Sequence, residues 1–310
     1  MKSINNYVSL LFMLIIFFSC KTIEKHRYRE GDRSAEEINI SYEEERQMTE
    51  EILFEFKKDF PPYSDKLVQD YISELGMKIV RANNLENNPY NYSFAVVSSE
   101  QVNAFALPAG VIFVTLPLLA MVETEAELAG VLSHEIGHVV ARHAAYRIDK
   151  ARRETGKTLL YTLGGGVLGG ALGYGLGRIF CAPDDKECLE GALSYGAFGG
   201  TAAAMLIQKY YFLANSREDE MEADRIGFRL ATNAGYSKDY VGKFYERLLE
   251  MERQRKTLNI EALNTLEHAF STHPPSLERV EQMNELVLES YDKNGIVNTE
   301  SFLEVKKRVK

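Results

Sequence analysis

The chain has 310 residues, which is enough for one large catalytic domain or two small ones. Hydrophobic residues make up 45% of it and charged residues 26%, which is an ordinary globular balance. A formal net charge of -9, with no concentrated basic stripe, argues against a nucleic-acid partner.

The N-terminus begins MKSINNYVSLLFMLIIFFSC. Lys2 precedes an apolar run over 7–18, which is typical of a bacterial secretory signal. Ser19 and Cys20 end the run and resemble a lipobox, in which the cysteine is lipidated and becomes the mature N-terminus. We therefore predict a lipoprotein-type signal peptide over 1–19 and a lipid-anchored protein of the bacterial cell envelope that faces the periplasm. The alternative is an uncleaved membrane anchor, although the run is short for a spanning helix.

Residues 20–42 are polar, show no clear period and are predicted to form a tether. A helix is expected next over 41–60, ended by Pro61 and Pro62. A second helix is expected over 64–83, where apolar residues repeat at helical spacing. Short runs of β-branched and aromatic residues then predict a small sheet. Its strands are expected at 92–98, 103–106 and 111–115.

The second half of the chain is predicted to be mainly helical. Its first helix is expected over 124–151, with Thr124 as the N-cap and Glu127 completing a capping box. Further helices are expected at 216–235, 238–255 and 277–291. Residues 291–310 are predicted to be a polar tail. Together the elements indicate a mainly helical α+β fold with one domain over 43–290.

Residues 156–215 are apolar and rich in glycine, and they contain several G-x-x-x-G spacings. This pattern predicts two closely packed helices, either inserted in a membrane or folded as a soluble hairpin over the core. A hydrophilic turn between the two halves is flanked by Cys181 and Cys188. In an oxidising compartment the two cysteines can form a local disulfide, and the alternative is two free thiols.

The segment GVLSHEIGHVVARH carries the strongest chemical signal. His134 and His138 are one helical turn apart and share a face, so they can bind one metal ion. Glu135 lies about 100° further round, where it can reach a water on that metal. This H-E-x-x-H arrangement supplies two zinc ligands and a general base. The alternative is two solvated histidines on an ordinary helix, but the apolar neighbours predict burial, and Gly137 permits a close backbone approach.

A catalytic zinc needs a third protein ligand and one open position. His143 lies about 140° from His138 on a continuous helix, so it is unsuitable. The segment SREDEMEADRIG offers three glutamates: Glu218, Glu220 and Glu222. Glu220 has an acid one turn later, Asp224, which could accept the second N–H of a ligating histidine. Glu218 and Glu222 have the same spacing, but two glutamates would repel there. The alternative is a solvated acidic helix face, in which Arg217 pairs with an acid rather than facing a cleft.

Four motifs together, HEIGH, SREDEMEAD, NAFALPAG and STHPP, resemble the Ste24/HtpX-like family of zinc metallopeptidases, and its periplasmic lipoprotein branch in particular. The resemblance covers about residues 45–285. It implies a zincin-like domain with one Zn²⁺ per chain, in which Glu135 is the catalytic base and Asp224 the acid that orients a ligand. The implied zinc ligands are His134, His138 and Glu220.

In that family, NAFALPAG forms an edge strand beside the active-site cleft. The resemblance therefore implies that Asn103, Ala104 and Phe105 bind an extended protein or peptide substrate. The STHPP loop runs near the metal in the family, so His273 is predicted to stabilise the oxyanion or to occupy the open zinc position in a resting state. The alternative is a loop whose prolines set the start of the next helix.

These observations predict a zinc-dependent endopeptidase that acts on misfolded or misassembled envelope proteins. Two other classes remain open. One is a non-proteolytic or latent chaperone-like assembly factor on the same fold, and the other is a membrane-embedded interaction protein built on residues 156–215. The sequence implies no particular oligomeric state.

Overall fold

The computed structural model describes residues 38–150, 153, 215–258, 266–291 and 294–309. The predicted signal peptide, the lipidation site Cys20, the cysteine pair and nearly all of the glycine-rich segment lie outside the described residues. Within the described part of the chain, no helix is both long and apolar enough to cross a membrane.

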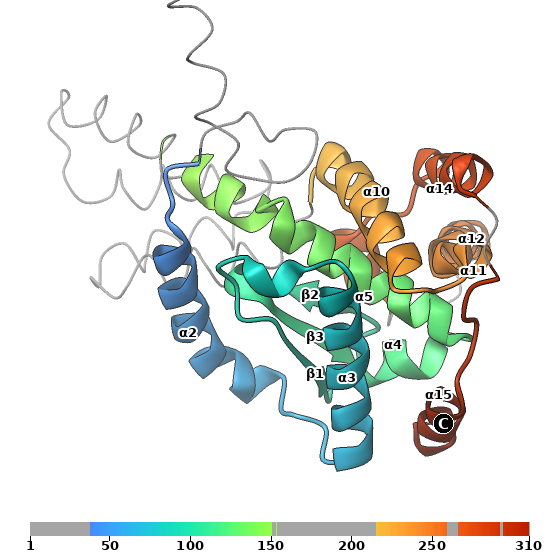
Figure 1. Ribbon diagram of the computed structural model, residues 1–310, viewed down its shortest axis with the longest axis horizontal. Helices are drawn as coiled ribbons and strands as arrows, with labels where there is room; N and C mark the ends of the chain where they lie inside the picture. The colour runs from blue at the N-terminus through green and yellow to red at the C-terminus, as the bar shows by residue number, and fades with distance from the viewer. Residues whose placement is uncertain (1–37, 151–152, 154–214, 259–265, 292–293, 310) are drawn as a thin grey trace, which may run out of the picture.

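Helices surround one small three-stranded sheet, which confirms the expected α+β class (Figure 1). The N-terminal half contains α2 (Tyr42–Asp59), α3 (Lys66–Ala82), η1 (Leu85–Asn87), β1 (Ser93–Val97), β2 (Ala104–Ala106), η2 (Pro108–Gly110), β3 (Val111–Thr115), α4 (Leu116–Met121) and α5 (Glu125–Val140). The C-terminal half contains α10 (Arg217–Asn233), α11 (Lys238–Val241), α12 (Lys243–Leu258), α13 (Glu267–Thr272), α14 (Leu277–Glu289) and α15 (Glu300–Arg308).

The sheet has the strand order β1-β3-β2, so β2 is an edge strand. β1 pairs parallel with β3, and β2 pairs antiparallel with β3. Side chains alternate between the two faces, as the pleat of a strand requires. One face joins the main core beneath α3 and α5 through Phe94, Val96, Ala104, Ile112 and Val114. The other packs against α2 through Ala95, Phe105 and Phe113.

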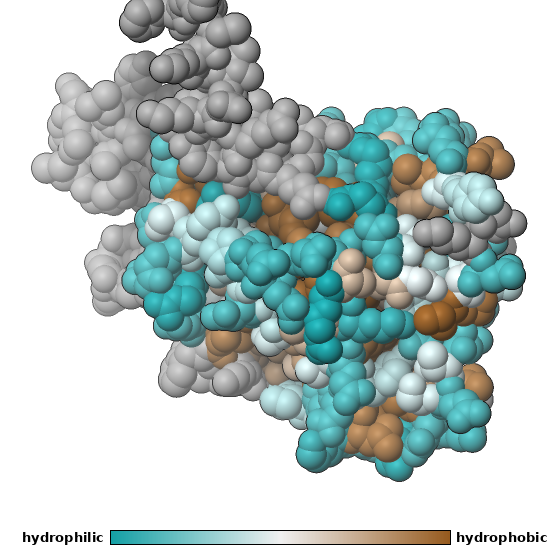
Figure 2. All heavy atoms as spheres, in the orientation of Figure 1, coloured by the Kyte–Doolittle hydropathy of each residue, from teal (hydrophilic) through white to brown (hydrophobic). Residues whose placement is uncertain are grey.

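Helix α5 lies at the centre of the molecule, and every one of its residues is buried. The expected N-cap is confirmed, because the Thr124 hydroxyl accepts a hydrogen bond from the Glu127 amide at 3.2 Å. The expected capping box is not formed, because the Glu127 carboxylate accepts from the Glu123 amide rather than from that of Thr124. Hydrophilic residues cover most of the described part of the face shown in Figure 2, as expected when the apolar residues gather around this helix. The motif HEIGH therefore lies inside the protein rather than on a solvated helix face.

The prediction of one continuous helix over 124–151 is wrong, because α5 ends at Val140. Arg142 has a left-handed backbone with φ 55°, and a new helical stretch runs over 143–150. This conformation is unfavourable for a residue with a side chain, so neighbouring contacts must hold it. The Arg142 guanidinium donates to Glu45 Oε1 at 2.9 Å and to the Ile40 carbonyl at 2.5 Å.

Both predicted ends of the domain need correction. Ile38 and Ile40, assigned to the tether, are buried together with α2 against the face of the sheet that carries Phe105 and Phe113. Residues 291–310 are not a polar tail, because α15 places Phe302 and Val305 in the main core. These two residues are three positions apart, which is a helical spacing. The sequence analysis overlooked it because the surrounding residues are mostly polar. The fold therefore extends well beyond 43–290.

Helices α5 and α10 cross so closely that glycine is required at the contact on each helix. A Cβ atom on Gly227 would lie 2.8 Å from the backbone nitrogen of His134, and one on Gly137 would lie 2.9 Å from the Ala223 carbonyl oxygen. Both neighbours are backbone atoms, which cannot move aside as a flexible side chain can. The close approach expected at Gly137 is confirmed, and it brings the acidic face of α10 against the histidines of α5.

We expect Gly227→Ala to separate these helices. The free energy of unfolding of the metal-free protein should fall by about 1–3 kcal/mol, because the added methyl group overpacks a backbone contact. Gly242→Ala is the matched control, since its Cβ would meet the flexible side chain of Met283. Chemical denaturation of both variants measures the difference. Equal stability of the two variants would contradict the proposed crossing.

Candidate active site

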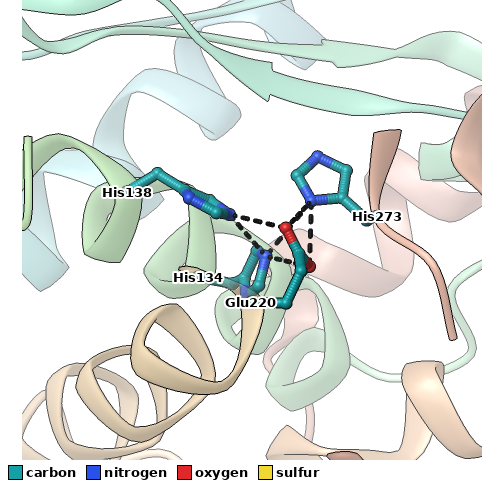
Figure 3. A group of neighbouring side chains, drawn as sticks. All are labelled: His134, His138, Glu220 and His273. Atoms are coloured by element: carbon teal, nitrogen blue, oxygen red, sulfur yellow. Dashed lines mark hydrogen bonds and ion pairs between the residues drawn. The ribbon is translucent and has the colours of Figure 1, made fainter. Parts of the chain in front are cut away.

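Four side chains from three parts of the chain converge at the α5–α10 crossing (Figure 3). His134 and His138 come from α5, Glu220 from the first turn of α10, and His273 from the residue that follows α13. One potential ligand atom from each residue lies within 4.8 Å of all the others. The structure therefore brings together the three residues predicted as zinc ligands and the histidine predicted to lie near the metal.

The spacing of these atoms fits a tetrahedral metal site. His134 Nε2 lies 3.0 Å from His138 Nε2. The Glu220 carboxylate lies 3.3 Å from the first of these nitrogens and 3.2 Å from the second. His273 Nδ1 lies 3.1 Å from Glu220 Oε1 and 3.3 Å from His134 Nε2. Zinc with ligand bonds of about 2.0–2.1 Å separates neighbouring ligand atoms by roughly 3.3 Å.

An acid and an arginine support one side of this cluster. His134 Nδ1 lies 2.8 Å from Asp224 Oδ1, as the one-turn spacing from Glu220 suggested. The buried Arg279 guanidinium donates to both Asp224 oxygens, at 2.6 and 2.7 Å. Its third contact is 2.7 Å to Glu220 Oε2. Arg279 comes from α14 and carried no recognisable signal in the sequence.

The two carboxylates are held ionised. Burial raises the pKa of Glu220, but His273, Arg279 and His134 outweigh it and lower that pKa well below its usual value. Burial likewise raises the pKa of Asp224, and Arg279 and His134 reverse the effect and lower it. An ionised Glu220 can donate an electron pair to a cation without first losing a proton.

The two histidines of the HEIGH motif differ in the direction in which their pKa values are shifted in the metal-free protein. Burial dominates at His138 and lowers its pKa well below the usual value, so its ring is neutral. Burial also opposes charge on His134, but Glu220 and Asp224 outweigh it and raise the pKa to about 9. A metal ion that binds here at neutral pH must therefore displace a proton from His134.

His143 lies outside the metal cluster, as its sequence position predicted, yet it contacts that cluster directly. Its Nδ1 lies 2.7 Å from Nδ1 of His138, and its Nε2 lies 2.9 Å from Glu222 Oε2. All three side chains are buried. The sequence analysis missed this contact, because it assumed a continuous helix and the break at Arg142 turns the ring toward His138.

Glu135 and the STHPP loop meet beside the cluster. Glu135 is buried, and its Oε1 lies 3.5 Å from His273 Nε2. The same histidine ring therefore contacts the metal cluster through Nδ1 and the expected general base through Nε2. Asn215, which the sequence analysis also missed, donates to Glu220 Oε1 at 2.6 Å. It lies at the end of the glycine-rich segment, where no spacing rule identifies it.

A cleft borders this site. Its lining includes Phe105, Leu107 and Pro108 from β2 and the residues after it, together with Glu135, His138 and Thr272 from the helices. Edge strand β2 therefore lies beside the cleft, as expected. Of the three residues predicted to bind substrate, Phe105 lines the cleft, whereas Asn103 and Ala104 are buried and do not line it.

Two charged candidates lie elsewhere. Arg217 forms an exposed ion pair with Glu278 on α14 and does not line the cleft. Glu218 is exposed in the first turn of α10. Of the three glutamates that the sequence offered, Glu220 is therefore the one that reaches the histidines of α5.

Two histidines one turn apart, a glutamate beside them, a carboxylate from a second helix and a neighbouring edge strand define the site of an H-E-x-x-H metallopeptidase. The sequence profile of Peptidase family M48 matches residues 66–287. The chain therefore belongs to Peptidase family M48, and the resemblance inferred from the four motifs is confirmed at the level of the family.

Named relatives come from bacteria and from mitochondria. The Beta-barrel assembly-enhancing protease of Escherichia coli (strain K12) is 28% identical over 214 residues, which cover 69% of this chain and 39% of that protein. The Mitochondrial metalloendopeptidase OMA1 of Arabidopsis thaliana is 28% identical over 249 residues, covering 80% of this chain and 41% of the relative. The match thus spans about two fifths of the length of these relatives.

Proposed function

We propose that this protein is a zinc-dependent endopeptidase that cleaves unfolded or misassembled proteins of the bacterial envelope. The observation that carries the proposal is the convergence of His134, His138 and Glu220 with ligand-atom separations of 3.0–3.3 Å. Membership of Peptidase family M48 supports peptide-bond hydrolysis. The name of the bacterial relatives, beta-barrel assembly-enhancing protease, supports an envelope role.

Each residue has a distinct part in the proposed reaction. His134, His138 and Glu220 hold the zinc ion, which when bound supplies Lewis acidity and a water acidified to a pKa of about 7. Glu135 accepts a proton from the attacking water and delivers it to the leaving nitrogen. The edge of β2 aligns an extended substrate by backbone pairing, with Phe105 beside it in the cleft.

Metal analysis and casein cleavage test this proposal on the purified full chain. We expect about one zinc ion per chain, and cleavage that stops on chelation and returns when zinc is restored. Zinc without cleavage under any condition would instead favour the non-proteolytic assembly factor. Cleavage that persists after complete removal of metal would reject the zinc peptidase.

We further propose that His273 occupies the fourth zinc position in a resting state. A catalytic zinc site has three protein ligands and one open position, whereas four protein ligands close it. The separations of His273 Nδ1 from Glu220 and His134 support a fourth ligand at this place. Its contact with Glu135 means that the same ring also covers the base.

We expect His273→Ala to raise the casein cleavage rate about tenfold, if the closed state holds about nine molecules in ten. Zinc content should stay unchanged, because the other three ligands remain. The double variant His273→Ala/Glu135→Gln serves as the control and should be inactive. A fall in cleavage at unchanged zinc content would instead assign His273 to oxyanion stabilisation.

The location that we propose is the periplasmic side of a membrane, with the lipid carried by Cys20. The signal-like N-terminus supports it. Incorporation of labelled fatty acid into the parent chain, and its loss in Cys20→Ala, would test the anchor. A disulfide between Cys181 and Cys188 stays a prediction, and thiol labelling with and without reductant would test it.

A further inference from the structure

The two histidines of the HEIGH motif are supported differently. His134 is contacted by an acid directly, through the 2.8 Å approach of Asp224 Oδ1 to its Nδ1. At His138 the same ring position faces Nδ1 of His143, 2.7 Å away, and not a carboxylate. The carboxylate contacts His143 instead, since Glu222 Oε2 lies 2.9 Å from His143 Nε2.

The donors and acceptors in the series His138, His143 and Glu222 follow from the position of His138 at the metal site. A ring that presents Nε2 to a metal carries its hydrogen on Nδ1, so His138 donates from Nδ1 to His143. His143 then accepts at Nδ1 and carries its own hydrogen on Nε2, from which it donates to Glu222. Each of the two contacts then has one donor and one acceptor, and both lie within ordinary hydrogen-bond distance.

We propose that His143 and Glu222 are positioning residues of the metal site, which fix the orientation and tautomer of the His138 ring as Asp224 does for His134. This inference rests on the proposed zinc function. Helix α10 would then supply the proposed ligand Glu220 and also both acids that orient the histidines, Asp224 and Glu222.

The burial of this chain of contacts supports the assignment. His143 is 0% exposed and Glu222 is 2% exposed. Asp219 Oδ1 lies 3.6 Å from His143 Nε2, so a second acid of α10 faces the same nitrogen. The His143 ring lies between these acids and His138, and neither of its nitrogens is among the four converging ligand atoms. Its geometry suits it to hold His138 in place.

The test is zinc affinity of the full chain, measured by competition with a chromophoric chelator at one pH. Loss of such outer contacts commonly weakens metal binding 10- to 100-fold, so we expect His143→Leu to raise the zinc Kd by about that factor. Glu222→Gln should raise it about tenfold. His143→Asn retains an acceptor near the Nδ1 position and should recover most of the affinity. Glu218→Gln, on the exposed face of the same helix, is the matched control and should leave the Kd unchanged.

The unfolding midpoint of each metal-free variant separates a local effect from a damaged fold. The proposal is overturned if Glu222→Gln and a folded His143→Leu both bind zinc as tightly as Glu218→Gln does. Should His143→Leu fail to fold, Glu222→Gln decides alone, and zinc binding as tight as that of Glu218→Gln would overturn the proposal. The absorption spectrum of bound cobalt gives a second readout, which should change in Glu222→Gln and not in Glu218→Gln. Since neither readout involves cleavage, a protein that binds zinc but lacks peptidase activity would leave this inference standing.

Discussion

Glu135→Gln is expected to reduce casein cleavage about a thousandfold, while the zinc content stays near one ion per chain. The amide keeps the size of the side chain but cannot accept a proton from the attacking water. Glu135 is not among the four residues whose ligand atoms converge, so the metal should remain bound. Atomic absorption and cleavage assays on the same sample measure both quantities.

The control for this experiment is Glu123→Gln, which removes an exposed carboxylate just before α5. It should cleave casein at the parent rate. A Glu135→Gln protein that keeps its zinc and cleaves within tenfold of the parent would exclude Glu135 as the general base. Loss of zinc in this variant would show instead that the glutamate contributes to metal binding.

Arg279→Met is expected to cause the largest loss of stability. The side chain is 2% exposed and contacts both buried carboxylates, Asp224 and Glu220. Removing one partner of a buried ion pair leaves an uncompensated charge, so the free energy of unfolding of the metal-free protein should fall by about 3–5 kcal/mol. Zinc should recover part of this loss, because a cation at the cluster also neutralises Glu220.

The matched control is Arg217→Met. Arg217 is exposed, and its ion pair with Glu278 lies at the surface, where such pairs contribute about 0–1 kcal/mol. Denaturant titrations of both variants, with and without zinc, give the comparison. A loss below about 1 kcal/mol for metal-free Arg279→Met would contradict the proposed role of Arg279 in balancing the two acids.

Local periodicity explains how much of the site the sequence could predict. His134, Glu135 and His138 lie on one helix, so their relative directions follow from its geometry alone. Glu220 and Asp224 could be selected among several acids because they are one turn apart and act as a pair. The mainly helical α+β class followed from the same periodic patterns and from the β-branched runs before residue 115.

The residues that sequence analysis missed depend on contacts between distant segments. His143 reaches His138 only because Arg142 adopts a left-handed conformation, and Arg142 is held by Glu45, 97 residues away. Arg279 meets Asp224 across 55 residues. A helical wheel drawn through 124–151 places His143 on the wrong side, because no local signal marks the break.

Residues 39–45 contact the segment that follows α5 and so support the metal site from a distance. Ile40 and Glu45 bind the Arg142 side chain, and the Asn39 amide donates to Asp149 at 3.1 Å. A shortened soluble protein should therefore begin before Ile38, even though every metal-binding residue lies far downstream. Proteolytic trimming beyond that point would loosen the turn at Arg142 and so weaken the peptidase, although the residues removed lie far from the HEIGH motif in the sequence.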